Sequence, residues 1–398
     1  MRVLFVPLPW PTHYFAMVGL AWACRLQGDE VRVAAGPGVV DAVNGSGMPA
    51  APVSADFDFM GALARDSRGE LRWNGPGQPV TEVLRTTPVD RYRLLAESMV
   101  DDLLRLARRW SPELVVWDPA VFAGPLVARA LGVPSVRHTW GPDVTRLLGW
   151  PGMGSEDPAA VPPGWPDPLV ALFARHGLGT CADLADLTVD ICPSRLQVPG
   201  ARNRQPLRYT PYNGPGVLPD WLYEEPKRPR VCLSWGTAST HLVGTKDFAV
   251  PKVLDALSTV DIEVVVTAKA ADLPLIGEPP ANARVVEQLP LSQLLPSCAA
   301  IVHQGGSGTV MTAAYHGVPQ LAGGTVGDQE FNAARLSEAG TGVALPIASA
   351  GPSQIRDAVA GLCAEPKVRT AAAELREEMA AITAPAEVAA RLRALVGQ

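Results

Sequence analysis

The feature that most constrains the fold is a rhythm of buried strand, helix and buried strand that runs through the chain twice. The first round begins with "RVLFVPL", a strand pattern, "FAMVGLAWACRLQG", a helix ending at Gly28, and "EVRVAA", a second strand. After a polar region (56–89) we expect a helix to about Trp110, the strand "ELVVWD", the helix "AGPLVARALG" and the strand "PSVRH". Strands that alternate with helices in this way are typical of a parallel sheet.

A proline-rich segment, residues 208–229, separates this round from the second and is typical of an extended interdomain linker. The second round predicts strands at "RVCLSW", "IEVVVTA", "ARVVEQ" and "AAIVHQ", and a helix at "AVPKVLDALSTV". Helical spacing returns in "KVRTAAAELREEMAAI" and "PAEVAARLRALV". We therefore predict an α/β fold of two Rossmann-like doubly wound domains (1–207 and 230–380), followed by a C-terminal helix (381–398). In such folds ligands bind beyond the carboxyl ends of the strands, so we expect the site in a cleft between the domains.

Length and composition agree with a two-domain globular enzyme. The chain has 398 residues, too many for one hydrophobic core, with 47% hydrophobic and 19% charged residues. A net charge of -6 offers no basic surface for nucleic acid. The apolar run at the N-terminus is too short for a signal peptide and no run suits a membrane span, while the six cysteines form no C-x-x-C pair. The simplest expectation is a cytoplasmic protein with reduced thiols and no membrane partner.

A glycine-rich turn in "IVHQGGSGTVMTAAYHGVP" (301–319) is the strongest candidate for an anion site. It is not a dinucleotide fingerprint, because Met311 stands where G-x-G-x-x-G requires its third glycine, and no P-loop occurs in the chain. The turn enters a predicted helix at about Thr309, and the N–H groups and dipole of a helix start favour an anion. A tight turn with no ligand is the alternative. The candidate phosphate-binding residues of this stretch are His303, as a further donor, Gly305, Gly306, Ser307, Gly308 and Thr309.

Two other segments follow strands of the same predicted sheet. "SWGTAST" offers Ser234, Gly236 and Thr237, although glycines after strands often only turn the chain. "GDQEFNAARL" places Asp328 and Gln329 at a helix start. An Asp there is commonly a cap, but neighbouring acid and amide groups also suit vicinal sugar hydroxyls, and Asn332, one turn later, would face the same way.

A candidate acid-base pair comes from the first domain. His13 follows the first strand, ahead of the expected first helix, and Asp118 ends a strand that should neighbour it. Histidine titrates near neutral pH and can act as a general base, and a carboxylate behind the ring fixes its tautomer. A structural or solvated histidine is the alternative for His13 taken alone.

The run 285–345, with its "HQGGSGT" and "GDQEFN" motifs, resembles the nucleotide-sugar signature of the family 1 glycosyltransferases, which have the GT-B fold. The N-terminal stretch "MRVLFVPLPWPTHYFAMVGLAWACRLQGDEV" is similar to the actinomycete branch that transfers deoxysugars from dTDP to polyketide natural products in antibiotic biosynthesis. The resemblance covers nearly the whole chain. It implies an acceptor-binding N-terminal domain, a nucleotide-sugar-binding second domain, and C-terminal helices that pack back toward the first.

The resemblance also implies an inverting single displacement. His13, assisted by Asp118, would deprotonate an acceptor hydroxyl while the turn at Gly306 stabilises the leaving diphosphate. Asp328 and Gln329 would hold the sugar, and the backbone around Gln288 and Leu289 would meet the base. No tightly bound cofactor is implied, and a divalent ion such as Mg²⁺ is not required by the motifs.

The chain departs from its relatives at two positions. Gln304 stands where relatives often carry a second histidine, with an effect that the sequence does not define. Met311 replaces a glutamate that grips the ribose hydroxyls in plant members, and this change fits a 2′-deoxyribose, hence dTDP rather than UDP.

Aromatic and apolar side chains in predicted loops and strand ends of the first domain could pack on a hydrophobic polyketide aglycone, although each could equally belong to the core. These candidates are Trp10, Phe15, Met17, Trp73, Trp140 and Trp150. Alternative functions are a GT-B transferase for a lipid-linked saccharide, a GT-B-like epimerase, or a non-catalytic nucleotide-sugar-binding auxiliary protein. A homodimer is left open.

Overall fold

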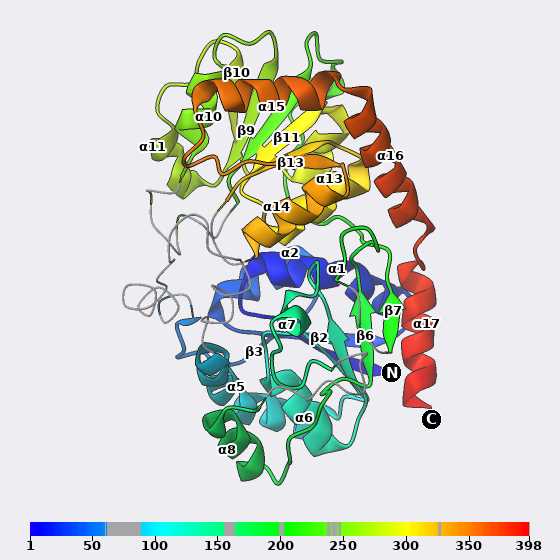
Figure 1. Ribbon diagram of the computed structural model, residues 1–398. Coiled ribbons are helices and arrows are strands. Elements are labelled where there is room, and N and C mark those ends of the chain that lie inside the picture. The colour runs from blue at the N-terminus through cyan, green and yellow to red at the C-terminus, as the bar shows by residue number, and fades with distance from the viewer. Residues whose placement is uncertain are drawn as a thin grey trace. The chain divides into compact units, whose positions relative to one another are not determined.

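A computed structural model describes residues 1–59, 61, 89–154, 164–198, 203–236, 240, 245, 248–324 and 328–397. These residues form two units, each with its own parallel sheet (Figure 1). Unit 1 comprises Met1–Cys192, Gln197–Gly214 and Ile382–Gln398, and unit 2 comprises Pro193–Leu196 and Pro215–Ala381. The chain passes between the units at Gly214, within the proline-rich segment.

Unit 1 contains a seven-stranded sheet in the order β3-β2-β1-β4-β5-β6-β7, with every neighbouring pair parallel. Its strands are β1 (Arg2–Val6), β2 (Glu30–Ala35), β3 (Ala50–Pro52), β4 (Leu114–Trp117), β5 (Ser135–His138), β6 (Leu187–Asp190) and β7 (Arg204–Pro206). Its helices are α1 (Pro11–Leu26), α2 (Val40–Gly45), α5 (Val89–Trp110), α6 (Ala123–Leu131), α7 (Val144–Leu147), α8 (Asp167–Arg175) and α17 (Pro385–Val396).

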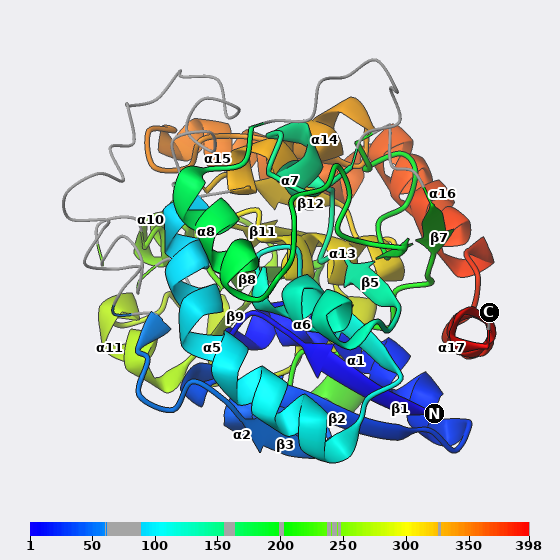
Figure 2. The same ribbon diagram turned by 90° about the horizontal axis from the view of Figure 1, so that it is seen from below.

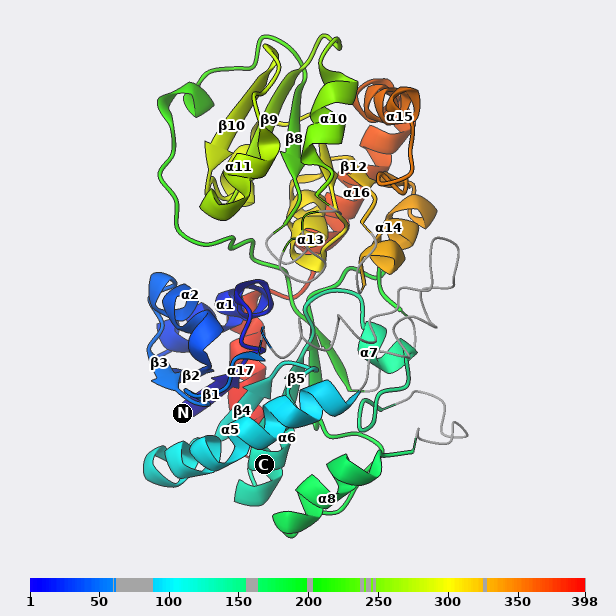
Figure 3. The ribbon, with the colours of Figure 1, turned by 90° about the vertical axis from the view of Figure 1, so that its left-hand side faces the viewer.

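Helices cover both faces of this sheet because its strand order reverses between β1 and β4. Right-handed crossovers that run in opposite directions from this point place their helices on opposite faces. Figure 3 shows α1 and α2 on one side of the strands and α5 and α6 on the other, and α5 and α6 lie side by side in Figure 2. Gly124 lets α6 approach the sheet, because a Cβ there would lie 2.4 Å from Cβ of Trp117.

Unit 2 contains a six-stranded parallel sheet in the order β10-β9-β8-β11-β12-β13. Its strands are β8 (Arg230–Ser234), β9 (Glu263–Ala268), β10 (Ala283–Glu287), β11 (Ala300–His303), β12 (Gln320–Ala322) and β13 (Gly342–Ala344). Its helices are α10 (Val250–Leu257), α11 (Leu273–Ile276), α12 (Leu291–Leu294), α13 (Ser307–His316), α14 (Gln329–Glu338), α15 (Pro352–Ala364) and α16 (Pro366–Ala381).

Alternate side chains along the strands of unit 2 build two cores. On β8, Val231 and Leu233 pack toward α10 and α15, whereas Cys232 between them packs toward α12 and α13. Residues on a strand point to opposite faces in turn, so a continuous apolar strand such as "RVCLS" serves both layers. This double burial explains why strands such as β1, β4, β8 and β11 could be predicted from short apolar runs. The short strands β3, β6, β7, β12 and β13 were not predicted.

The last helix, α17, packs against α1 in unit 1, as predicted. Arg393 anchors it through hydrogen bonds to Asp29 Oδ1 (2.6 Å) and to the carbonyl of Gln27 (2.9 Å). The buried Asp29 also accepts from the N-terminal ammonium of Met1 (2.8 Å). Among the helices in the described part of the chain, none is both long and apolar enough to cross a membrane.

Candidate functional site

In unit 1, the point where the strand order reverses brings His13 and Asp118 together. β1 and β4 are hydrogen-bonded neighbours, and Asp118 directly follows β4. His13 lies in the first turn of α1 rather than ahead of the helix, because Pro11 already starts it; proline is well tolerated at a first helical position. The carboxyl edge of a parallel sheet at such a reversal is the usual place for a ligand site.

The geometry of this pair is that of an oriented base. His13 Nδ1 lies 2.7 Å from Asp118 Oδ2, and the other carboxylate oxygen accepts from the N–H of Ala120 (2.8 Å). The Asp118 side chain is buried, whereas 21% of the His13 side chain is exposed. A proton on Nδ1 that points at the carboxylate leaves Nε2 with a free lone pair, able to take a proton from a substrate.

The predicted acceptor residues fall into different environments. Trp140 packs on the His13 ring at a centroid distance of 4.6 Å, and Trp10 directly precedes α1. Phe15 lies on α1 and meets Tyr212 edge to face. Met17 and Trp150 are both buried, which is the alternative that the sequence left open for each of these residues. Met17 is on the inner side of α1 and Trp150 is buried against Tyr92, so both belong to the core; Trp73 lies outside the described residues.

In unit 2, the glycine-rich turn lies at the corresponding reversal of strand order, between β8 and β11. Helix α13 begins at Ser307, two residues earlier than predicted, with Gly306 at its N-cap and no acidic residue in its first turn. The backbone N–H groups of Ser307 and Gly308 have no acceptor among the residues that the structure describes. Free N–H groups at a positive helix end can bind an anion.

Asn332 and Asp328 hold this turn in shape. Asn332 Nδ2 donates to the carbonyl of Gly305 (2.9 Å) and to Ser307 Oγ (3.0 Å), and the Ser307 hydroxyl donates to Asp328 Oδ2 (2.6 Å). Asn332 is buried and its Nδ2 serves the turn, whereas its Oδ1 has no hydrogen-bond partner within the described residues. Gln329, beside Asp328 at the start of α14, is also buried.

His303 has an internal role, so the expectation that it donates to a phosphate does not fit its contacts. Its Nδ1 accepts from the N–H of Gly305 (2.9 Å), and its Nε2 lies 3.0 Å from Gln320 Oε1. Both ring nitrogens are therefore engaged within the protein. Burial lowers the pKa of His303 to about 4, although the bond to Gln320 acts in the opposite direction.

The remaining predicted donor contacts lie on the same edge of this sheet. Ser234 ends β8 opposite His303, and Gly236 adopts a φ of 69° just beyond it, while Thr237 lies outside the described residues. Gln288 follows β10 with a φ of 52°, which is uncommon for a residue other than glycine and is often found at functional sites. Leu289 is buried in the core beneath it.

Sequence reasoning left Gln304 without a role and missed His138. His138 ends β5 next to Asp118; its Nδ1 lies 2.8 Å from the carbonyl of Thr139, and burial lowers its pKa to about 4. That His138 lies next to Asp118 follows only from the pairing of β5 with β4. Gln304 was visible as an amide among glycines, but its surroundings required the structure.

The two buried histidines predict a response to acid. The unfolded chain takes up these protons near pH 6.5, whereas His138 and His303 in the folded protein take them up near pH 4. The folded state is therefore expected to lose stability as the pH falls from about 6.5 toward 4. In NMR titrations of ¹³C-labelled histidine, assigned with His138→Gln and His303→Gln, both rings should stay neutral down to about pH 5. A midpoint above pH 6 for either ring would contradict the burial described here.

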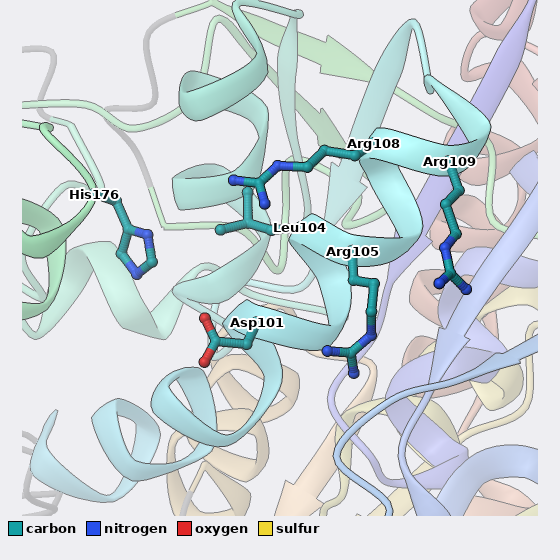
Figure 4. Close-up of a pocket in the computed structure, with 6 residues that line it drawn as sticks. All are labelled: Asp101, Leu104, Arg105, Arg108, Arg109 and His176. Atoms are coloured by element: carbon teal, nitrogen blue, oxygen red, sulfur yellow. The ribbon is translucent and has the colours of Figure 1, made fainter.

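Unit 1 also contains a cavity of about 500 Å³ that is not lined by His13 or Asp118 (Figure 4). α5 ends at Trp110, just before β4 begins, so the second half of this helix lies near the amino ends of the strands, opposite the edge that carries His13. The lining residues are Asp101, Leu104, Arg105, Arg108, Arg109 and His176. Within the described ranges, no group of three or more His, Cys, Asp or Glu side chains is placed to hold a metal ion.

Comparisons with known proteins cover both units. The sequence matches the family described as erythromycin biosynthesis protein CIII-like, in its N-terminal domain over residues 22–236 and in its C-terminal domain over residues 251–395. It is 37% identical over 424 residues to the 10-deoxymethynolide desosaminyltransferase of Streptomyces venezuelae, covering 100% of this chain and 98% of that protein. It is 35% identical over 415 residues to the 3-alpha-mycarosylerythronolide B desosaminyl transferase of Saccharopolyspora erythraea, covering 98% and 96%.

Two similar solved structures contain thymidine diphosphate. The spinosyn rhamnosyltransferase SpnG complexed with thymidine diphosphate has a TM-score of 0.81 and 29% identity, covering 99% of this chain and 100% of that one. The glycosyltransferase VinC in complex with dTDP has a TM-score of 0.79 and 33% identity, covering 100% of both chains. The chain therefore belongs to the erythromycin biosynthesis protein CIII-like family, and it is a glycosyltransferase of the GT-B fold.

Proposed function

We propose that this glycosyltransferase moves a deoxysugar from a dTDP-sugar to a hydrophobic polyketide-type aglycone in antibiotic biosynthesis, by an inverting displacement with His13 as the general base. The observation that carries the mechanism is the His13–Asp118 pair, with a 2.7 Å contact at Nδ1 and a partly exposed ring. A protein that only bound a nucleotide sugar would need neither group.

In the proposed reaction, His13 Nε2 takes the proton of the acceptor hydroxyl. The hydroxyl oxygen forms a bond to the anomeric carbon as the bond from that carbon to the diphosphate oxygen breaks, and the electron pair leaves with dTDP. Attack opposite the leaving group inverts the anomeric configuration. Asp118 remains ionised and stabilises the imidazolium that forms, while the buried carboxylate keeps the ring in one orientation.

The donor would bind along the carboxyl edge of the sheet in unit 2. The N–H groups of Ser307 and Gly308 and the dipole of α13 would stabilise the negative charge that develops on the diphosphate. The base would lie near Gln288 and Leu289, beyond β10, three interstrand spacings of about 4.8 Å from β11. Asp328 would contact the sugar through Oδ1, since Oδ2 already accepts from Ser307.

Two observations support dTDP as the nucleotide. The related SpnG and VinC structures contain thymidine diphosphate. Met311 is fully buried in α13, so no carboxylate extends from this position toward a ribose 2′-hydroxyl. The relatives named above are, by their names, desosaminyltransferases for 10-deoxymethynolide and 3-alpha-mycarosylerythronolide B, which supports a deoxysugar and a polyketide-type acceptor here.

The test is a donor-by-acceptor panel with the purified protein, read by mass spectrometry. With dTDP-deoxysugars and macrolactone or aromatic polyketide aglycones, we expect at least one glycoside together with an equal amount of released dTDP. A product formed only from a lipid-linked saccharide would favour that alternative. Donor binding without turnover across a broad panel would favour a non-catalytic role.

A further inference from the structure

We propose that Gln304 is a donor-binding residue whose neutral side-chain amide contacts the diphosphate of the nucleotide sugar, beside the start of α13. This inference rests on the proposed function of the glycine-rich turn and extends it to a residue to which the sequence motifs gave no role. Three features carry the inference: the position of the amide, the missing hydrogen-bond partner of its oxygen, and the absence of lysine and arginine in the neighbouring sequence.

The Gln304 amide occupies the space that two glycines leave open. A Cβ on Gly236 would lie 2.1 Å from Nε2 of Gln304, and a Cβ on Gly306 would lie 2.7 Å from the same atom. Gly236 belongs to the turn after β8, and Gly306 is the N-cap of α13. The amide therefore lies between the two turns at the reversal of strand order, beside the N-cap of α13.

The amide is also buried without full hydrogen bonding. Gln304 is 6% exposed, and its Oε1 has no hydrogen-bond partner within the described residues. An unsatisfied buried carbonyl costs about 1–3 kcal/mol, so an apolar side chain of the same length would suit a purely structural position better. The unpaired Oε1 is an acceptor, so a hydroxyl of the donor sugar would satisfy it, while Nε2 of the same amide would donate to a phosphate oxygen.

The third feature is the lack of positively charged side chains in the sequence around the two turns. No lysine or arginine occurs in residues 231–245 or 300–334, which include both turns. The two turns themselves therefore offer a diphosphate backbone N–H groups, the dipole of α13 and neutral side-chain donors. In such a site, one further hydrogen-bond donor at the N-cap of α13 would strengthen diphosphate binding.

Calorimetric titration of the full-length protein with dTDP-glucose and with thymidine tests the role of Gln304. Gln304→Met keeps the length of the side chain and removes its polar atoms, and it should weaken dTDP-glucose binding by about tenfold, the effect of one hydrogen bond to a charged group. Gln304→Glu should weaken it further by repulsion. Thymidine, which has no phosphate, should bind equally to all variants. Gln293→Met, the same change at an exposed glutamine of α12, is the matched control.

Thermal unfolding separates ligand binding from packing. Without ligand, Gln304→Met should unfold at the same or a higher temperature than the wild type, because a buried unpaired carbonyl is removed. With dTDP-glucose its stabilisation should be smaller than that of the wild type. Equal affinity for dTDP-glucose in both proteins would overturn the role of Gln304 alone, whereas a wild type that binds neither dTDP-glucose nor dTDP itself would overturn the proposed function as well.

Discussion

His13→Ala should lower the turnover number by about 10²- to 10⁴-fold while dTDP-sugar binding is retained. The range is that of a general base removed from an otherwise intact site. Binding should survive because the proposed donor contacts lie in unit 2, on the turn between β11 and α13, and none of them involves His13. Initial rates of dTDP release and calorimetric titration with the donor measure the two quantities separately.

Asp118→Asn should also lower turnover, by a different route. An amide nitrogen facing His13 Nδ1 would donate a hydrogen bond to it, which moves the ring proton to Nε2 and removes the lone pair that accepts the substrate proton. The substitution keeps the size of a side chain that is almost completely buried. Unfolding temperatures close to the wild-type value would show that the loss of turnover reflects the tautomer rather than the fold.

His176→Ala is the matched control for these variants, because His176 lines the cavity beside α5 and not the edge of the sheet that carries His13. It should leave turnover within about twofold of the wild type, as is usual for a substitution away from the reacting groups. A rate near the wild-type value for His13→Ala would show that another group, or solvent, takes the acceptor proton.

The contact between His13 and Asp118 could be predicted because it follows from the parallel pairing of two strands. Adjacent parallel strands end at the same edge, so residues just after β1 and β4 are neighbours once those strands pair. The strands themselves were visible as short apolar runs, since both faces of each sheet are covered by helices. What the pattern missed was the helix start at Pro11, which shifts His13 into the first turn of α1.

Contacts that link distant elements of unit 2 could not be predicted. His303 is engaged by Gln320 on β12, and the glycine turn is held by Asn332 on α14, 27 positions beyond Gly305. The first contact depends on the pairing of β11 with β12, and the second on how α14 packs over β12 and β13; neither is encoded in local spacing. The internal role of His303 was therefore hidden, although a polar residue at the end of a buried strand has a good prior chance of being satisfied internally.

The position of Met17 could have been inferred from the sequence. Tyr14, Met17, Val18 and Ala21 follow the i, i+3, i+4, i+7 spacing of one helix face, and all four are buried. This spacing favours the core, which was the alternative for Met17, over an aglycone contact. Trp150 offered no such signal, because its burial against Tyr92 of α5 joins segments far apart in the sequence.

Gly305→Ala should abolish or strongly weaken donor binding, because this glycine shapes the turn from which α13 begins. Gly305 has a φ of 97°, a conformation that side chains rarely adopt, and a Cβ there would lie 2.7 Å from the carbonyl oxygen of Gln329. Backbone atoms at the start of α14 cannot rotate away as a side chain can. The turn would have to move, and with it the N–H groups of Ser307 and Gly308.

We expect Gly305→Ala to lower the free energy of unfolding by about 1–3 kcal/mol, the usual cost of a strained backbone position, and to weaken dTDP-glucose binding by at least about tenfold. Gly361→Ala is the matched control, since Gly361 lies within α15 and its added Cβ would meet no heavy atom closer than 3.9 Å. Alanine should stabilise that helix by about 0.5–1 kcal/mol and leave donor affinity unchanged. Denaturant unfolding and calorimetry of both variants give the comparison. If Gly305→Ala bound dTDP-glucose as tightly as the wild type, the backbone of this turn would not be what holds the diphosphate.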